Sequence, residues 1–436
     1  MITPDQHTGE HASAVVFAVL PPKSAESERL AEIKDLLSSA DIECVAELVQ
    51  HRDHPFAHTY LGPGRLQDLS ALIKETGATS AVCEDDMTPS QVAAVLDAVD
   101  VDVLDRTELI LSVFAKHANT IEGRLQVDLA QLQYELTRVR GKGLVMSRLG
   151  GGGDMRGPGE MKLEVDRRVI RQRIQQLKRR VDHLAQTRRT QRVRRVRATL
   201  PLITLAGYTN AGKSTLLNAL TGADVSVRDR LFETLDPTTR AFRYRDRDYL
   251  LTDTVGFIRK LPHLLVDAFA STLEEASIAD LLLVIVDAGL EASEIAAHQD
   301  TVAGVLAEIG ADKVPRLTVY NKIDLLDAGG RSRLAARDPE GLQVAAATGE
   351  GVDELRERIA RFFEDQLVPV RLLVPYTDGA VTGRLRGLGA DIREESTADG
   401  IIVEARLPRA EADRYRRYIM AGEPADDDTE PDESGP

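Results

Sequence analysis

Short apolar runs alternate with helical patterns along the first quarter of the chain. Runs of Val, Ala, Leu and Ile predict buried strands at 13–20, 43–49, 79–83 and 101–104. Apolar residues spaced three or four apart predict helices at 25–39, 63–76 and 88–98. This alternation is typical of a small α/β domain on a parallel sheet. The segment 61–64 (LGPG) favours a turn into the second helix over a ligand loop, because no lysine or serine completes a phosphate cradle there.

The pattern then changes to two long heptad helices, at about 107–139 and 160–197. Apolar residues recur at alternating four- and three-residue steps, which form the seam of a coiled coil. They are Leu125, Leu129, Leu132, Leu136 and Val139, then Leu163, Ile170, Ile174, Leu177, Val181 and Leu184. A glycine-rich segment, 141–159, joins the two and predicts the tip loop of an antiparallel hairpin with arms of ~45 Å or more. The loop is longer than a simple connector requires. This length favours a loop that becomes ordered when it binds a partner, rather than a flexible linker.

A phosphate-binding motif follows an apolar run at 202–206 and precedes a helical pattern at 216–220. Its residues are Gly207, Tyr208, Thr209, Asn210, Ala211, Gly212, Lys213, Ser214 and Thr215. Strand, glycine loop and helix in this order let backbone N–H groups and a helix N-terminus surround a phosphate chain. Lys213 would reach the β- and γ-phosphates, and Ser214 would bind Mg²⁺.

A second motif, D-T-V-G, comprises Asp253, Thr254, Val255 and Gly256 and ends the apolar run 249–252. Asp253 would hold Mg²⁺ through water. Gly256 would offer its N–H to the γ-phosphate with no Cβ in the way. The pattern is weak alone, but its place at a strand end after the phosphate loop makes it specific.

The third motif selects the base and comprises Asn321, Lys322, Ile323 and Asp324, after the apolar run 317–320. The Asp324 carboxylate can accept hydrogen bonds from guanine N1–H and the 2-amino group, which adenine lacks. Lys322 would lie over the base, and Asn321 would brace the phosphate loop. Three motifs in this order predict a GTP-binding domain over 199–367, with GTP as the substrate.

A switch loop is expected between the first two motifs, in Phe232, Glu233, Thr234, Leu235 and Asp236 and onward to residue 239. Such loops need a threonine that completes the Mg²⁺ shell when the γ-phosphate is present. On spacing alone Thr234, Thr238 and Thr239 are all candidates. The metal ligands predicted are thus Ser214, Asp253 and one of these threonines.

Composition changes this picture mainly through charge. The chain has 436 residues and a net charge of −15, yet residues 138–197 carry 19 Lys or Arg against five Asp or Glu. This asymmetry predicts that the hairpin contacts a polyanion. Two cysteines and no apolar run long enough for a membrane span predict a protein of a reducing, cytoplasmic compartment. A monomer is expected, and peripheral membrane association is left open.

The expected domains are an N-terminal α/β domain at 1–106, the hairpin at 107–198, the GTPase domain, and a small C-terminal domain at 368–422. Apolar runs at 370–374 and 400–405 around a helical pattern at 378–388 predict a β-α-β unit in the last of these. The acidic tail, 423–436, is expected to be disordered.

The chain resembles the HflX family of ribosome-associated GTPases. The matching stretches are GYTNAGKS (207–214), FETLDPTTR (232–240), DTVGF (253–257), NKID (321–324), DRTELIL (105–111), EGRLQVDLAQLQYELTR (122–138), and RGPGE with KLEVDRR (156–168). The resemblance implies that Thr234 is the switch threonine, acting with Lys213 and Gly256 in catalysis. It also implies binding to the large ribosomal subunit, hydrolysis of GTP to GDP and phosphate, and splitting of ribosomes stalled under stress. The hairpin tip would reach toward the peptidyl-transferase region and its rRNA.

Two features depart from the usual pattern of this family. Ala345, Ala346 and Ala347 stand where a Ser-Ala-x motif contacts guanine, although the Ala346 N–H can still supply that contact. Met161 replaces a threonine near the hairpin tip. Phe257, within the matching DTVGF stretch, occupies a position where many other GTPases have a water-orienting glutamine, which predicts slow intrinsic hydrolysis and an activating group supplied by a partner.

Two other functions stay open at this point. One is a GTP-regulated protein-interaction module without a ribosomal target, which modulates a membrane protease. The other is a separate enzymatic role for the N-terminal domain, such as ATP-driven RNA remodelling, which ranks lower because that domain has no second phosphate loop.

Overall fold

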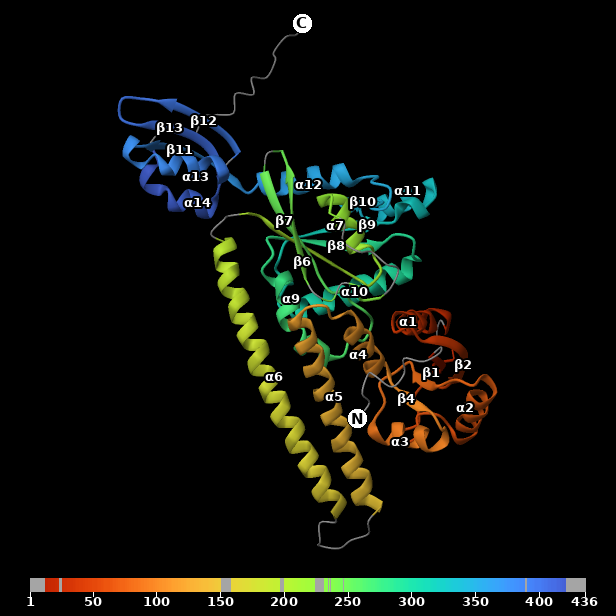
Figure 1. Cartoon of the computed structure of the whole chain (residues 1–436). Helices are drawn as coiled ribbons and strands as arrows, with labels where there is room; N and C mark the ends of the chain where they lie inside the picture. Colours follow the sequence, from red (N-terminus) through yellow and green to blue (C-terminus); the bar gives the residue numbers. More distant parts are fainter. Residues whose placement is uncertain are drawn as a thin grey trace.

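The computed structural model describes residues 12–22, 26–149, 158–196, 200–223, 231–233, 235, 237–245, 247–388 and 390–420. The predictions for Thr234, Asp236 and the acidic tail lie outside these residues. Three sheets and one long helical hairpin make up the described chain (Figure 1). Within this part of the chain, no helix is both long and apolar enough to cross a membrane.

The N-terminal unit is a parallel α/β layer, as the sequence predicts. Its strands are β1 (Ser13–Leu20), β2 (Glu43–His51), β3 (Ser80–Cys83) and β4 (Asp102–Leu104), in the order β2-β1-β3-β4. Its helices are α1 (Glu26–Ser39), α2 (Pro63–Thr76) and α3 (Pro89–Ala98). All eight residues of β1 are buried, which explains its unbroken apolar run. Gly62 caps α2, so the predicted turn is confirmed. Of the two cysteines, Cys83 is buried and Cys44 is half-buried.

The predicted single helix over 107–139 is wrong, because the chain forms α4 (Arg106–His117) and then α5 (Ile121–Leu149). The Thr120 hydroxyl accepts a hydrogen bond from the Gly123 N–H at 2.9 Å, which starts a new helix after an extended Ala118. The predicted tip loop is also too long. α5 continues to Leu149 and α6 (Pro158–Val196) starts one residue before Gly159, so two glycines in α5 do not stop the helix.

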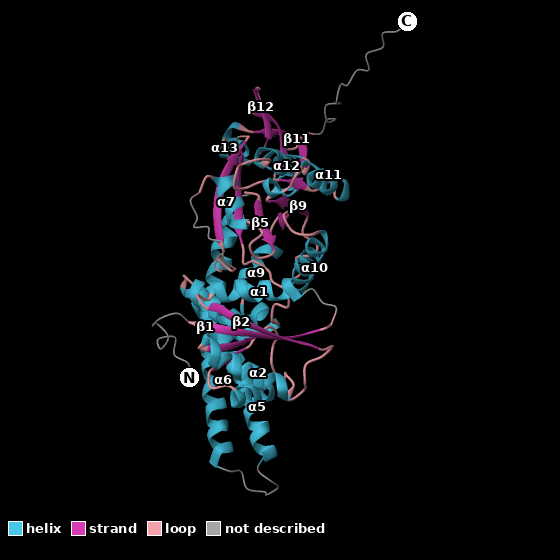
Figure 2. Ribbon diagram, turned by 90° about the vertical axis from the view of Figure 1, so that its right-hand side faces the viewer, coloured by secondary structure: helices cyan, strands magenta, loops and turns pink. Residues whose placement is uncertain are grey.

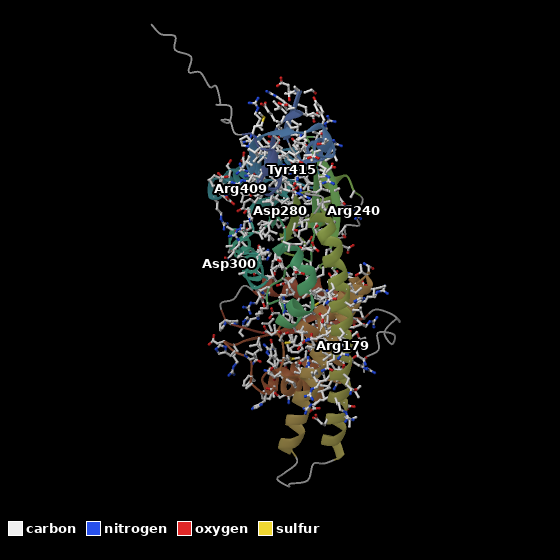
Figure 3. The ribbon with its side chains drawn as sticks, turned by 90° about the vertical axis from the view of Figure 1, so that its left-hand side faces the viewer. Arg179, Arg240, Asp280, Asp300, Arg409 and Tyr415 are labelled. Atoms are coloured by element: carbon white, nitrogen blue, oxygen red, sulfur yellow. The ribbon has the colours of Figure 1, made fainter. Side chains whose placement is uncertain are left out.

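The hairpin itself is confirmed, since α5 and α6 run antiparallel along each other (Figure 1). Leu129, Ile170 and Ile174 form a buried cluster at the predicted heptad seam. The opposite side of α6 faces solvent and carries basic side chains. Figure 3 shows one of them, Arg179, well away from the sheet that carries Arg240.

The GTPase unit is a six-stranded sheet in the order β10-β9-β8-β5-β7-β6, parallel except for β6. Its strands are β5 (Leu202–Gly207), β6 (Thr238–Tyr244), β7 (Arg247–Asp253), β8 (Leu281–Asp287), β9 (Arg316–Asn321) and β10 (Leu342–Gln343). Its helices are α7 (Lys213–Thr221), α8 (His263–Ala268), α9 (Ala270–Ser277), α10 (Ala292–Glu308), α11 (Ala328–Arg337) and α12 (Val352–Glu364). The three nucleotide motifs start at the carboxyl ends of β5, β7 and β9, on the same edge of this sheet, which is where open parallel sheets bind ligands.

The last unit has one more strand than the β-α-β prediction. It comprises β11 (Leu367–Val374), α13 (Ala380–Leu388), β12 (Ala390–Ser396), β13 (Ile401–Pro408) and α14 (Arg409–Arg414), with an antiparallel sheet ordered β11-β13-β12. β12 has no apolar run because it is an edge strand whose charged residues reach solvent. One of them, Glu394, pairs with Arg386 of α13 at 2.5 Å.

The N-terminal unit packs directly on the GTPase unit, below its sheet in Figure 2. One buried cluster draws apolar residues from both, including Leu36 of α1, Phe114 of α4 and Phe269 after α8. α5 also contacts α8. The hairpin therefore starts at the junction between the two units.

Candidate nucleotide site

The phosphate loop turns sharply at two glycines where a Cβ atom would lie too close to neighbouring atoms. Gly212 has φ +89°, and a Cβ there would lie 2.2 Å from Asn321 Nδ2. A Cβ on Gly207 would lie 2.4 Å from the Ile285 carbonyl oxygen. α7 begins directly after Gly212, so its N-terminus opens into the curl of the loop.

Lys213 lies inside this loop with its side chain buried. Its ammonium group donates to the Tyr208 carbonyl at 2.8 Å and to the Gly207 carbonyl at 3.2 Å. Burial lowers the pKa of Lys213 to about 8, and the nearby Asp253 carboxylate acts in the opposite direction. An ammonium group has three donors, so this one can also serve an anionic ligand such as a phosphate.

Asp253, fully buried at the end of β7, meets the phosphate loop through Ser214. The Ser214 hydroxyl donates to Asp253 Oδ2 at 2.6 Å. Hydroxyl and carboxylate oxygens are ligands of the kind that Mg²⁺ takes, so these two residues fit such an ion. The next residue, Thr254, is fixed by a 2.7 Å hydrogen bond from its hydroxyl to the Leu205 carbonyl.

The segment after Val255 pairs with the phosphate loop like a short strand. The Thr209 N–H donates to the Phe257 carbonyl at 2.7 Å, and the Phe257 N–H donates to the Gly207 carbonyl at 3.1 Å. A Cβ on Gly256 would lie 2.8 Å from Thr209 Cγ2 and 2.9 Å from Lys213 Nζ. The Phe257 ring is buried in the core, which is a packing role.

The Asn-Lys-Ile-Asp motif joins three loops through the side-chain amide of Asn321. Asn321 Nδ2 donates to the Ala211 carbonyl at 2.9 Å, and Asn321 Oδ1 accepts from the Ala346 N–H at 3.0 Å. The guanine contact that the resemblance implies for Ala346 would therefore compete with this hydrogen bond. Ala345 is buried beside it and Ala347 is exposed.

The other residues of this motif flank the same loop. Lys322 has φ +65° and pairs with Asp287 at 2.8 Å. Ile323 is buried and starts a short 3₁₀ turn that presents Asp324 to solvent. The exposed Asp324 carboxylate at this edge of the sheet is accessible to the nucleobase of a bound nucleotide.

The described residues of the predicted switch loop pack into the core that the GTPase unit shares with α4. Phe232, with φ +59°, stacks edge-to-face on Phe114 of α4 at 4.6 Å, and its carbonyl contacts His117 Nδ1 at 2.8 Å. Leu235 is buried in the same core, and Glu233 is half-buried. Because both side chains are buried in this core, Phe232 and Leu235 could contact a nucleotide only through their backbone atoms.

The other two threonine candidates, Thr238 and Thr239, lie in β6. Thr239 Oγ1 is 2.9 Å from Thr252 Oγ1 on β7, so these hydroxyls hydrogen-bond across the strand pair.

A polar network that the sequence analysis did not anticipate joins the phosphate loop to α1. The Tyr208 hydroxyl donates to Glu32 Oε1 at 2.9 Å and accepts from the Arg259 N–H at 2.8 Å. Arg106 is 1 % exposed and donates to the same Glu32 oxygen at 2.9 Å and to the Arg259 carbonyl at 3.0 Å. The Tyr208 ring stacks on His298, with centroids 3.6 Å apart. No local sequence signal marks these pairs.

Two carboxylates after β3 bind the residues that follow the D-T-V-G motif. Arg259 pairs with Glu84 at 3.2 Å and Lys260 pairs with Asp85 at 2.6 Å. Burial, together with the charge of Asp85, raises the pKa of Glu84 to about 7, although the nearby Lys260 and Arg106 act against the shift.

This raised pKa predicts a pH-dependent stability. Between pH about 4.5 and 7 the folded chain holds more protons at Glu84 than the unfolded chain, so the contribution of this carboxyl group to stability falls as the pH rises. The melting temperature of Glu84→Gln minus that of the wild type should therefore increase from pH 5 to pH 8. Thermal unfolding of both full-length proteins at four pH values measures it.

Glu340→Gln is the matched control, because Glu340 is 82 % exposed and pairs with Arg358 at the surface. Its difference from the wild type should stay flat over the same range. A flat difference for Glu84→Gln as well would show that the Glu84 pKa is not raised.

A phosphate loop, a buried strand-end aspartate and an Asn-Lys-Ile-Asp turn on one sheet define the chain as a P-loop GTPase. Three family models match successive segments: GTP-binding GTPase N-terminal over 27–115, GTP-binding GTPase Middle Region over 117–195, and 50S ribosome-binding GTPase over 202–322. The chain is 42 % identical to the GTPase HflX of Caldanaerobacter subterraneus subsp. tengcongensis over 409 residues, which is 94 % of each protein. It is 37 % identical to the GTPase HflX of Escherichia coli, covering 91 % of this chain and 93 % of the relative. The chain belongs to the GTPase HflX family.

A GTP-binding protein from the archaeon Sulfolobus solfataricus, solved in complex with GDP, is a structural neighbour. It is 24 % identical, covers 80 % of this chain and 97 % of its own length, and superposes with a TM-score of 0.44.

Proposed function

We propose that the chain binds GTP with Mg²⁺ in the site above and hydrolyses it while bound to the large ribosomal subunit, and that this cycle splits or recycles stalled ribosomes. The family match to 50S ribosome-binding GTPases supports the partner. A ribosomal partner implies a cytoplasmic protein. The observation that carries the proposal is that the segments flanking Thr234 and Gly256 pack against α1 and α4, at the base of the basic hairpin.

In this site the phosphate loop, 207–215, would hold the phosphate chain, with the Lys213 ammonium group at the β- and γ-phosphates. Ser214 and Asp253 would hold Mg²⁺, with Thr234 completing its shell in the GTP state. Held there, the ion would supply positive charge that offsets the charge of the phosphates. The Gly256 N–H would sense the γ-phosphate, and Asp324 would read guanine while Asn321 keeps its loop against the phosphate loop.

Through these contacts, binding of a γ-phosphate would change the position of the hairpin. If Gly256 turned its N–H toward a γ-phosphate, Arg259, three residues further along the chain, would be displaced with it. Arg259 pairs with Glu32 and Glu84 of the N-terminal unit. Phe232 is likewise held by Phe114 and His117 of α4, which leads directly into α5. Ordering both segments around GTP would therefore move the base of the hairpin.

The hairpin has the charge that an RNA contact needs. The exposed side chains of α6 include Arg168, Arg171, Arg173, Lys178, Arg179 and Arg180. Such a surface gains affinity for a phosphate backbone by releasing counterions, which makes binding salt-dependent.

One experiment tests the proposal. GTP turnover of the purified chain is measured alone and with large subunits, and compared with a variant in which residues 150–157 are replaced by a Gly-Ser linker of equal length, which keeps α5 and α6. We expect subunits to raise turnover at least about tenfold in the intact chain and less in the variant, since Phe257 cannot orient water. Pelleting with subunits should be stronger with a non-hydrolysable GTP analogue than with GDP and should decrease at high salt. Equal pelleting with both nucleotides, or equal binding of adenine nucleotides, would refute it.

A further inference from the structure

Thr209, in the phosphate loop, has a buried hydroxyl group that the fold does not use. The residue is 6 % exposed, and its Oγ1 atom has no hydrogen-bond partner within the described residues. Buried hydroxyl groups are nearly always paired, because leaving one without a partner costs its desolvation. A side chain kept in this state inside a ligand-binding loop is a candidate for a contact with the ligand.

The surroundings of Thr209 indicate which part of the ligand it would meet. Its backbone is fixed by the 2.7 Å hydrogen bond from its N–H to the Phe257 carbonyl. Its Cα and Cγ2 atoms lie 2.9 and 2.8 Å from the position that a Cβ on Gly256 would take, and Lys213 Nζ lies 2.9 Å from the same point. The Thr209 side chain is thus next to the ammonium group and to the glycine proposed to sense the terminal phosphate.

We propose that the Thr209 hydroxyl donates a hydrogen bond to a γ-phosphoryl oxygen of bound GTP, an inference that rests on the nucleotide binding proposed above. An anionic oxygen is the strongest acceptor available to a hydroxyl donor. GDP lacks this oxygen, so the contact favours GTP over GDP. Phe257 cannot make such a contact because its ring is buried in the core.

The alternative is that Thr209 only packs against Gly256 through its methyl group. Valine separates the two roles, since it keeps the shape and removes the hydroxyl. In the nucleotide-free protein, Thr209→Val should not lower the melting temperature, because no hydrogen bond of the described fold is lost.

The decisive measurement is the dissociation constant of a fluorescent non-hydrolysable GTP analogue and of fluorescent GDP, in Mg²⁺ buffer, for the full-length chain. Thr209→Val should weaken binding of the GTP analogue about tenfold or more and leave GDP within about twofold. Thr209→Ser, which keeps the hydroxyl, should retain most of the preference.

Thr204→Val is the matched control. Thr204 is fully buried in β5, and its hydroxyl donates to the Glu275 carbonyl at 3.2 Å. This variant should melt at a lower temperature with its ratio of GTP to GDP affinity unchanged.

The inference is overturned if Thr209→Val changes both affinities equally or changes neither, results that would leave the proposed GTPase cycle standing. A wild-type chain that fails to bind the GTP analogue at all would refute the proposed function and this inference together.

Discussion

Gly212→Ala is expected to weaken guanine nucleotide binding by two to three powers of ten. A left-handed backbone costs an alanine about 1–2 kcal/mol, and the new Cβ would lie 2.2 Å from Asn321 Nδ2 at φ +89°. Asn321 must then give up its hydrogen bonds to the Ala211 carbonyl and the Ala346 N–H, each worth about 1 kcal/mol. The empty loop of the variant should relax to relieve these costs, so nucleotide binding must restore the strained loop at a cost of roughly 3–4 kcal/mol, the size needed for that loss of affinity. Equilibrium titration with fluorescent GDP measures it.

Gly222→Ala isolates the backbone part of this effect. Gly222 ends the same helix, α7, at φ +68°, but a Cβ there would meet nothing within 4 Å. This variant should lose about 1–2 kcal/mol of stability and keep its nucleotide affinity within about threefold. If the two variants bind GDP equally well, the contact between Gly212 and Asn321 does not hold the two loops together.

The nucleotide motifs could be predicted because each consists of a few consecutive residues. A glycine loop between a strand and a helix, or an aspartate at a strand end, needs only its neighbours to be recognised. Helix positions in the N-terminal unit followed from periodicity for the same reason. The break at Thr120 was missed although its signal is local, since a capping threonine stands directly before Ile121 and α5. β12 was missed because an exposed edge strand needs no apolar pattern.

The contacts between units could not be predicted. Glu32 and Tyr208 are 176 positions apart, and Arg106 and the Arg259 carbonyl are 153 apart. Nothing in a single sequence relates residues at such separations. For the same reason Phe232 was assigned to the nucleotide from its motif alone, whereas its ring belongs to a core shared with α4. The sequence therefore predicted the chemistry of the site, but not the helices that the segments around Phe232 and after Gly256 contact.

Arg106→Met is expected to lower the free energy of unfolding by about 3–5 kcal/mol. Arg106 is 1 % exposed. Its guanidinium group forms ion pairs with Glu32 at 2.9 Å and Glu84 at 4.0 Å, and donates a hydrogen bond to the Arg259 carbonyl at 3.0 Å. Methionine fills similar volume but leaves the buried Glu84 carboxylate and the half-buried Glu32 carboxylate without this partner. Urea unfolding of the full-length chain, followed by circular dichroism, measures the loss.

The reason for this loss can be separated from simple misfolding. In a double variant, Glu32→Gln removes one of the two charges that Arg106→Met strands, so it should recover part of the lost stability. Arg65→Met is the matched control, because Arg65 pairs with Asp68 at the surface with 46 % of its side chain exposed and should change stability by less than about 1 kcal/mol. No recovery in the double variant would mean that Arg106 acts through packing rather than charge. Recovery would show that the loss comes from the unpaired Glu32 charge, and hence that Arg106 stabilises the fold by neutralising the carboxylate that also pairs with Arg259.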